Sequence, residues 1–280
     1  MANNSAIEWT EATWNPSTGC SKISPGCKNC YAEKLSNRLN LMKLEKYKKG
    51  FDFVQHISDV DIPLTWKNRK KIFVNSMSDL FHEQSSFEFV GRCFYTMIKA
   101  DRHDYQILTK RPERMVEFSK LFLKYFGHKI PNYVWMGVSV ENGDYVSRID
   151  QLRKVQCRTR FISFEPLIGP VGKINLREIH WAIIGGESGP KHRPIEKDWI
   201  LDIIRQCKRQ KVPVFFKQWG GFRPKSGGRT INNREYNRYP KIEKRNSLKN
   251  INFDEKAFAE LCLTNEVEKR EHLYRHNNLS

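Results

Sequence analysis

Residues 20–32 read Cys20-Ser21-Lys22-Ile23-Ser24-Pro25-Gly26-Cys27-Lys28-Asn29-Cys30-Tyr31-Ala32. Three of the seven cysteines of the chain lie within this stretch. Scattered cysteines are usually small buried hydrophobic residues, whereas cysteines this closely spaced are typical of metal ligands. Pro25 and Gly26 predict a turn, and a helical pattern begins directly after Cys30. A thiol beside a helix N-terminus favours the thiolate, which is the form that binds metals.

Three thiols restrict the kind of metal site that the loop can form. A structural zinc site is closed by four ligands, and the next cysteine, Cys93, lies far along the chain in a predicted helix. A [4Fe-4S] cluster takes a thiolate on each iron, so three thiolates leave one iron open to a substrate or cofactor. The ligand count therefore favours an open iron–sulfur cluster. A structural zinc site and a loop without metal are the alternatives.

The chain is strongly basic. Its 280 residues include 49 Lys and Arg against 31 Asp and Glu, a formal net charge of +18. This charge predicts an acidic partner, of which nucleic acid is the commonest; the alternative is a cationic surface that binds nothing specific. No apolar run approaches the length of a membrane span, and no signal peptide follows Met1. We therefore expect a cytoplasmic protein without membrane contact.

Short apolar runs alternate with helical patterns over most of the chain. After an extended segment at 5–14, the runs are 72–77, 105–109, 133–139, 160–165, 181–187 and 212–217. They are apolar on both faces, which is typical of parallel strands covered by helices. The alternation predicts βα units in one parallel sheet of about six or seven strands, short of the eight of a full barrel. We therefore predict an α/β fold, a partial (βα)6-type parallel barrel, with a doubly wound sheet as the alternative.

Two regions lie outside this alternation. A helix is predicted over 31–48, and a polar, irregular segment over 49–70. From about residue 222 the chain is rich in Lys and Arg, with Tyr236 and Tyr239 among them, and an amphipathic helix follows at 254–275. The basic segment either contacts nucleic acid, through phosphate pairs and tyrosine stacking, or is a mobile solvated loop. We predict a barrel at 1–221 and, packed on it, a basic extension with a closing C-terminal helix at 222–280.

Polar side chains follow nearly every apolar run. In a parallel βα sheet the carboxyl ends of the strands meet at one edge, where functional groups gather. The polar residues at these ends are Asn75, Ser76, Ser78, Asp79, Thr109, Lys110, Arg111, Ser139, Glu141, Glu165, Glu187, Ser188, Lys217 and Gln218. Glu165 stands in an apolar context, where an unpaired carboxylate is costly, so we expect a functional role for it. Gly185-Gly186 indicates either a close approach of the backbone to a ligand or a tight turn.

A cysteine loop, a helix and a series of βα units resemble the radical S-adenosylmethionine (SAM) superfamily and its partial barrel. A closer resemblance, from about Ser5 to Gly221, is to a phage-associated family of three-Cys-motif proteins of unknown function. It is carried by Ile7-Glu8-Trp9-Thr10, Thr13-Trp14-Asn15-Pro16, Gly19-Cys20, Ser24-Pro25-Gly26-Cys27, Cys30-Tyr31-Ala32 and Phe164-Glu165-Pro166-Leu167. The chain departs from the usual radical SAM pattern in the six-residue gap after its first cysteine and in Asn29 before its last. It also lacks Gly-Gly-Glu after the second strand.

This resemblance implies roles for individual residues. Cys20, Cys27 and Cys30 would ligate a [4Fe-4S] cluster. The residues that would bind SAM are Tyr31, Ser76, Ser78, Asp79, Gly185, Gly186 and Glu187. The catalytic residues facing the substrate would be Lys110, Arg111, Glu165, Lys217 and Gln218.

The implied activity is that of a radical SAM enzyme. It would cleave SAM reductively to a 5′-deoxyadenosyl radical that acts on a nucleic acid (DNA or RNA) or a nucleotide. Such an enzyme needs a reducing electron donor, and a partner protein is compatible with this function. The alternatives are a non-catalytic nucleic-acid-binding protein with a structural zinc or iron–sulfur site, and an enzyme on a small acidic metabolite.

Overall fold

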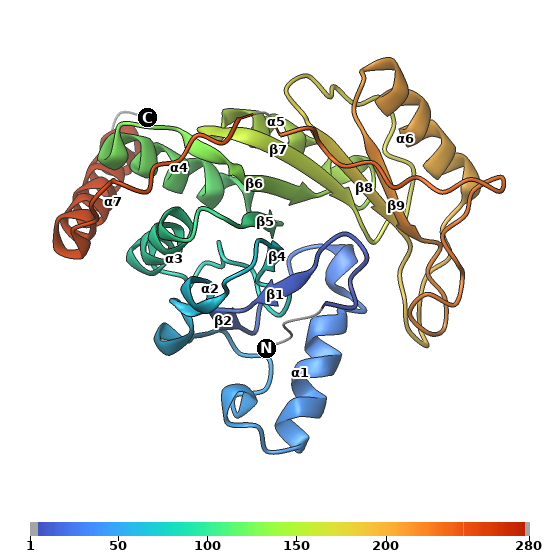
Figure 1. Cartoon of the computed structure of the whole chain (residues 1–280), viewed down its shortest axis with the longest axis horizontal. Helices are drawn as coiled ribbons and strands as arrows, with labels where there is room; N and C mark the ends of the chain where they lie inside the picture. Colours follow the sequence, from blue (N-terminus) through green and yellow to red (C-terminus); the bar gives the residue numbers. More distant parts are fainter. Residues whose placement is uncertain (1–4, 243, 278–280) are drawn as a thin grey trace.

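A curved sheet of seven parallel strands organises the chain (Figure 1). The computed structural model describes residues 5–242 and 244–277; residues 1 and 280, the outer limits of the predicted domains, lie outside this range. The strands are β1 (Ala12–Trp14), β4 (Lys71–Val74), β5 (Asp104–Thr109), β6 (Ile130–Ser139), β7 (Cys157–Phe164), β8 (Trp181–Gly185) and β9 (Val214–Gln218). Their order in the sheet is their order in the chain, so every crossover advances the same way. The predicted partial barrel is confirmed, and the doubly wound alternative is wrong.

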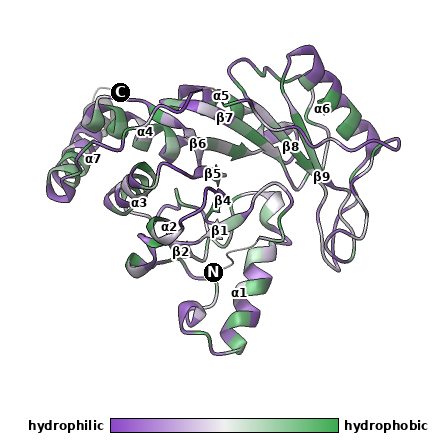
Figure 2. Ribbon diagram, viewed as in Figure 1, coloured by the Kyte–Doolittle hydropathy of each residue, from purple (hydrophilic) through white to green (hydrophobic). Residues whose placement is uncertain are grey.

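Most of the helices lie along the convex face of this half-barrel, whereas the first helix extends away from the sheet (Figure 1). The segment between β1 and β4 adds a small second sheet. The helices are α1 (Tyr31–Leu41), α2 (Ile62–Thr65), α3 (Phe87–Lys99), α4 (Pro112–Phe126), α5 (Ser147–Lys154), α6 (Lys197–Arg209) and α7 (Glu255–Asn277). The strands β2 (Ser17–Thr18) and β3 (Val54–Gln55) pair antiparallel. In Figure 2, β8, β9 and one side of α6 are hydrophobic, as expected for elements that pack on each other. No helix in the described ranges is long and apolar enough to span a membrane.

Two predicted elements are shorter than expected. The extended segment predicted over 5–14 forms a strand only at β1, and the helix predicted over 31–48 ends at Leu41. The helix stops because Lys43 adopts a left-handed conformation with φ 57°, which an α-helix cannot accommodate. A separate 3-10 turn, Glu45–Tyr47, follows. The segment predicted to be irregular over 49–70 contains β3 and α2.

An aromatic cluster fills the inner face of the half-barrel. Its buried members are Trp9, Phe73, Trp135, Phe161, Trp181, Ile183 and Phe215. Gly137 belongs to this face, and a Cβ atom there would lie 2.4 Å from the Phe161 ring. The amino-terminal half of the barrel is therefore closed by packed rings, which leaves the carboxyl edge as the place where a ligand could enter.

The basic extension makes defined contacts with the sheet. It runs antiparallel along β9, where Phe216 N–H donates to Tyr236 O at 2.8 Å and Arg238 N–H donates to Val214 O at 3.1 Å. Tyr239 then stacks on Trp181, with ring centroids 5.2 Å apart. The chain continues toward α7, which packs on α3 as predicted for the closing helix (Figure 1).

Arg245 shows how one cation of the extension is used. Its guanidinium pairs with Asp104, whose side chain is 4% exposed, and lies over the Tyr133 ring. It also donates to the carbonyl oxygen of His103 at 3.0 Å. This arginine therefore serves the packing of the extension, and is not available to a nucleic acid.

We expect Arg245→Ala to lower the free energy of unfolding by about 2 kcal/mol, because a buried carboxylate loses one of its two arginine partners. Urea unfolding followed by circular dichroism measures this change. Arg238→Ala is the control, since this exposed residue contacts the sheet through backbone hydrogen bonds. Equal losses in the two variants would contradict the structural role of Arg245.

Candidate functional site

The cysteine loop, residues 19–30, lies across the carboxyl edge of the half-barrel. Three acidic residues that follow β4, β6 and β8 hold it there: Asp79, Glu141 and Glu187. Each carboxylate is buried and each is paired with an arginine. We refer to Asp79–Arg111, Glu141–Arg148 and Glu187–Arg193 as the three latch pairs.

The first latch pair holds the loop at Cys20. The Thr109 hydroxyl donates to Asp79, with Oγ1 at 2.7 Å from Oδ1 and 2.9 Å from Oδ2. Arg111 Nη1 forms an ion pair with Asp79 Oδ2 at 3.2 Å. The same guanidinium donates to Cys20 Sγ at 3.6 Å and to the Ser21 hydroxyl at 2.7 Å. Arg111 is thus fixed by one carboxylate and directed at the first thiol.

An exposed acid extends this first contact. Glu83 accepts from Arg111 Nε at 2.9 Å and from the Ser21 hydroxyl at 2.6 Å. The hydrogen bond from Ser21, together with the Arg111 charge, holds the pKa of Glu83 at about 2. Glu83 therefore stays ionised and keeps Arg111 oriented.

The second latch pair holds the loop at Cys27. Glu141 is completely buried and accepts from Arg148 Nη1 at 2.8 Å and from the Ser24 hydroxyl at 2.6 Å. Gly26 lies so close to it that a Cβ atom would be 2.5 Å from Glu141 Cγ. Glycine is needed here because the loop backbone rests directly on the carboxylate side chain.

The third latch pair holds the loop beside Cys30. Glu187 Oε2 accepts from Asn29 Nδ2 at 2.9 Å and from Arg193 Nε at 3.0 Å. Asn29 also donates to the Lys191 carbonyl oxygen at 2.8 Å. The residue at which this chain departs from the radical SAM pattern is therefore the one that ties the loop to β8.

The three thiols are partly exposed, whereas the other four cysteines, Cys93, Cys157, Cys207 and Cys262, are buried in the core. Burial raises the pKa of Cys20 to about 12, against the opposing effect of Arg111. Burial also acts on Cys27, but the Lys110 charge and hydrogen bonds from the Ile23 and Ser24 segment outweigh it, so the pKa of Cys27 is lowered. The loop thus combines one thiol poised for ionisation with one that needs a further positive charge.

The donor set of the loop is three partly exposed thiols. Among the residues that the structure describes, no three Cys, His, Asp or Glu side chains form a group that could hold one metal ion. In an iron–sulfur cluster each thiolate binds a different iron. Lys22, Lys110 and Arg111 lie near the loop and would offset the negative charge of three thiolates.

Several residues that the sequence assigned to SAM or to substrate make hydrogen bonds within the protein, some of them to the loop. Both carboxylate oxygens of Asp79 and of Glu187 accept from protein donors. Ser78 donates to the Gly19 carbonyl oxygen at 2.6 Å, and Ser76 donates to Asn15 Oδ1 at 3.1 Å. Gln218 donates to the Ser188 hydroxyl at 2.9 Å. Their polar atoms are engaged by the protein, which is a supporting role that the sequence did not predict.

Other predicted site residues remain accessible at the same edge. The side chains of Lys110, Glu165 and Lys217 are 21%, 20% and 17% exposed. Lys217 Nζ pairs with Glu165 Oε1 at 2.5 Å, so the carboxylate that the sequence singled out does have a partner. Gly185 lies beside this pair, because a Cβ atom there would be 3.1 Å from Glu165 Cδ.

The two remaining predicted residues differ in accessibility. Gly186 is covered by the Trp219 carbonyl oxygen, 2.0 Å from where a Cβ atom would stand, so it serves a tight turn. The Tyr31 side chain is 54% exposed, and its hydroxyl donates to the Ser76 carbonyl oxygen at 2.5 Å. A fixed and exposed aromatic ring therefore stands directly beside Cys30.

The contacts that hold the loop involve several residues that the sequence did not identify as part of the site. They are Ser21, Ser24, Glu83, Arg148 and Arg193. The sequence did place Glu141 at a strand end, and this position could have indicated its role in holding the loop. The arginines gave no signal, because Arg148 lies in a helix and Arg193 in a loop, among many other cations.

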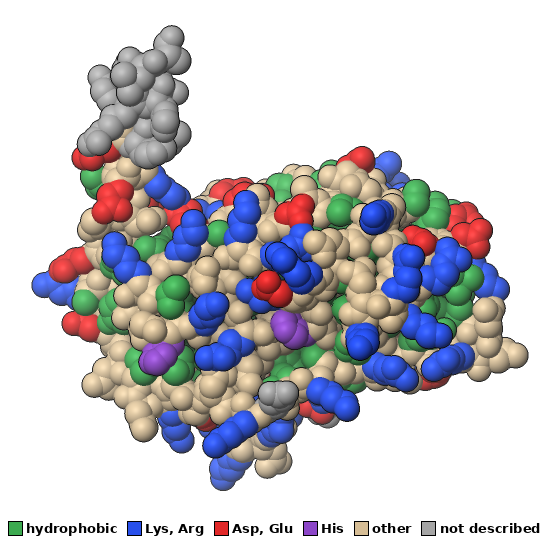
Figure 3. Space-filling model, turned by 90° about the horizontal axis from the view of Figure 1, so that it is seen from above, with side chains coloured by type: hydrophobic (Ala, Val, Ile, Leu, Met, Phe, Trp, Pro, Cys, Tyr) green, Lys and Arg blue, Asp and Glu red, His purple; other side chains and the backbone are tan. Residues whose placement is uncertain are grey.

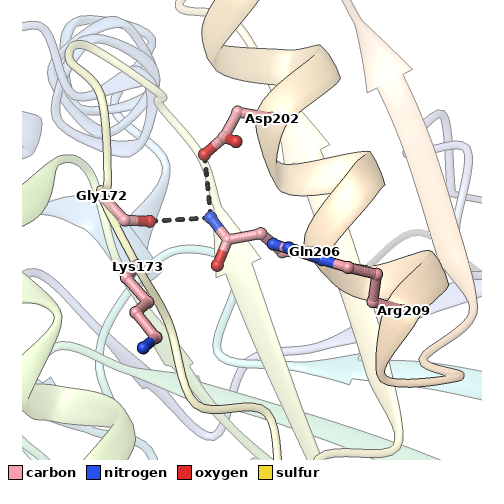
Figure 4. Close-up of a pocket in the computed structure, with 5 residues that line it drawn as sticks. All are labelled: Gly172, Lys173, Asp202, Gln206 and Arg209. Carbon is pink, nitrogen blue, oxygen red and sulfur yellow. Dashed lines mark hydrogen bonds between the residues drawn. The ribbon is translucent and has the colours of Figure 1, made fainter.

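One surface hollow lies apart from this site. Gly172, Lys173, Asp202, Gln206 and Arg209 line a volume of about 310 Å³ beside α6 (Figure 4). Gln206 spans it, with Nε2 donating to Gly172 O and to Asp202 Oδ2 at 2.8 Å each. None of its lining residues contacts the cysteine loop, so we do not assign it to the same function.

Comparison with known proteins identifies one family. A family model described as "Protein of unknown function (DUF5131)" matches residues 4–260. No curated protein and no solved structure matches the chain. The match includes most of the basic extension, which the sequence resemblance had left outside. It adds nothing on phages or on the radical SAM superfamily, so those parts of the resemblance stay predictions.

We expect Cys27 to be the most readily alkylated thiol of the metal-free protein. Its lowered pKa puts half-maximal iodoacetamide reaction at a lower pH than an ordinary thiol, and that of Cys20 at a higher pH. Lys110→Met removes the nearby positive charge and so raises the pKa of Cys27, and the rate at neutral pH should fall several-fold.

Peptide mass spectrometry after timed alkylation measures each cysteine separately. Lys173→Met, in the distant hollow, is the matched control and should leave the Cys27 rate unchanged. Faster reaction at Cys20 than at Cys27, or equal effects of the two lysine variants, would contradict this electrostatic description.

Proposed function

The chain belongs to the family described as proteins of unknown function (DUF5131), and we propose that it is an iron–sulfur enzyme of the radical SAM kind. Its substrate in this proposal is a nucleic acid or nucleotide. One observation carries the proposal. Three partly exposed thiols are latched over the carboxyl edge of a parallel half-barrel, while the other four cysteines are buried in the core.

Cys20, Cys27 and Cys30 would hold a [4Fe-4S] cluster, which leaves one iron without a protein thiolate. When bound, this group supplies an open iron that chelates SAM and a single electron that cleaves it to a 5′-deoxyadenosyl radical. Arg111 would stabilise the thiolate of Cys20, and Lys110 that of Cys27. The latch pairs contact the loop beside each of these three thiols.

The accessible residues at the edge would receive SAM and substrate. The exposed Tyr31 ring offers a stacking surface beside Cys30, as adenine or a nucleobase requires. The Glu165–Lys217 pair supplies one acceptor and one set of donors next to Gly185, where the absence of a side chain leaves room. These groups can bind the polar edge of a base and orient it.

The charge of the chain favours a polyanionic substrate. Figure 3 shows Lys and Arg side chains spread over one face of the molecule, with acidic side chains scattered among them, and the formal net charge of the chain is +18. A field of this sign raises the local concentration of nucleic acid and speeds its association. A small acidic metabolite would need a cationic site and not a cationic surface.

The test starts with protein purified without oxygen. We expect about four irons and about four sulfides per chain, and formation of 5′-deoxyadenosine after addition of SAM and dithionite. Cys27→Ala should lose both iron and this product. Cys262→Ala, which removes a buried thiol of α7, is the matched control and should keep both.

Zinc in place of iron, or iron without any 5′-deoxyadenosine, would contradict the proposal. Zinc together with salt-dependent binding of nucleic acid would support a non-catalytic binding protein instead. Full iron content in Cys27→Ala would show that the ligands are other residues.

A further inference from the structure

The first helix after the cysteine loop carries an exposed stripe that the packing of the fold does not explain. Along α1, Tyr31, Lys34, Arg38 and Leu41 are exposed, and their spacing of three to four residues puts them on one face. Ala32 and Ser36, on the opposite face, are buried. The stripe spans about 15 Å, from the residue that follows Cys30 to the last residue of the helix.

The far end of this stripe is apolar and projects from the molecule. Leu41, Met42 and Leu44 are 83%, 65% and 44% exposed. Figure 1 shows α1 and the turn after it extending away from the sheet, so these side chains form a tip. Two neighbouring apolar residues this exposed, on a projecting turn, are a costly arrangement unless something covers them.

The rest of the stripe is cationic. Lys34, Arg38 and Lys43 are exposed, and no acidic side chain in the described part of the chain pairs with any of them. The acids nearby are used elsewhere, Glu33 by Lys22 and Glu45 by Lys48. Lys34 and Arg38 are one helical turn apart, about 6 Å along the axis, so both can reach phosphates of one strand.

From this arrangement we infer that α1 is a nucleic-acid wedge. Leu41 and Met42 insert at a base step of a duplex, while Lys34, Arg38 and Lys43 hold the phosphates of one strand. The loosened strand then runs along the stripe, and a base of it stacks on Tyr31 beside the cysteine loop. The inference rests on the nucleic-acid substrate of the proposed function and does not depend on the metal.

The order of residues along the stripe favours nucleic acid over an acidic protein as the partner. Protein interfaces place apolar residues at the centre of the contact and charges at its rim. Here the apolar residues stand at the projecting tip, ahead of the cations, as in proteins that insert Leu or Met between base steps. A wedge would also be useful to the proposed enzyme, because a base inside a duplex has to be unstacked before it can be modified.

Fluorescence anisotropy with a short duplex that carries a central mismatch tests the inference, in a DNA and an RNA version. A 2-aminopurine beside the mismatch reports unstacking through its fluorescence. We expect the 2-aminopurine fluorescence to rise on binding of the wild-type protein. The double variant Leu41→Ser with Met42→Ser should abolish the rise and weaken binding about tenfold, the size expected for one lost stacking contact.

The cationic part is tested separately. The triple variant of Lys34, Arg38 and Lys43 to Ala should lower the slope of log Kd against log salt by about 2 to 3, since each phosphate contact contributes about 0.9. Leu263→Ser on α7 is the apolar control, because Leu263 is 59% exposed. Lys173→Ala with Arg209→Ala, in the hollow of Figure 4, is the cationic control. Both controls should bind as the wild type does.

Three results would overturn the inference: wild-type binding by the α1 variants, equal losses in the controls, or binding without any change in 2-aminopurine fluorescence. Equal binding of poly-L-glutamate, with the same loss in the α1 variants, would identify an acidic protein surface as the partner and would also overturn it. Duplex binding is measured without SAM or dithionite, which separates this inference from the proposed chemistry. Loss of binding and unstacking in the α1 variants supports the wedge even if the wild-type protein never forms 5′-deoxyadenosine.

Discussion

Three buried carboxylates at the ends of alternate strands are the constraint on which the rest of the site depends. A carboxylate removed from water costs several kcal/mol unless a cation and hydrogen-bond donors replace the solvent. Asp79, Glu141 and Glu187 each have an arginine, and each takes its remaining donors from elements around the cysteine loop. Side chains of the loop, Ser24 and Asn29, supply part of these donors to Glu141 and Glu187.

The two ends of the half-barrel differ in their access to solvent, and this difference also follows from packing. The aromatic cluster on the inner face is completed by Tyr239 and Ile242 of the extension, which pack against its rings. A parallel sheet of seven strands does not close on itself, and the extension covers the exposed edge of β9 by main-chain hydrogen bonds. What remains open is the carboxyl edge, where Lys110, Glu165 and Lys217 keep partial contact with solvent. Packing thus confines chemistry to the end at which the thiols are held.

The sequence allowed the barrel and the location of the site to be predicted, because both depend on patterns that are local. Apolar runs identify strands, and polar residues directly after them must meet at one edge. Which of these residues bind one another depends on contacts between distant parts of the chain. Ser24 and Glu141 are 117 residues apart, and Asn29 and Glu187 are 158 apart. The contacts of Asp79 and Glu187 with the loop therefore could not be predicted. The pairing of Arg245, a cation of the basic extension, with Asp104 could not be predicted either.

The latch pairs also bear on α1, since the helix begins at the residue after Cys30. Asn29 is tied to Glu187, and Tyr31 is tied to the Ser76 carbonyl oxygen, so the helix leaves the loop from two fixed points. A helix is stiff over three turns, and its direction is set where it starts. The same contacts that space the thiols therefore aim the tip of Leu41 and Met42. The three latch pairs would therefore fix two things at once. They would set the position of the tip that binds the nucleic acid relative to the thiols at which the chemistry takes place.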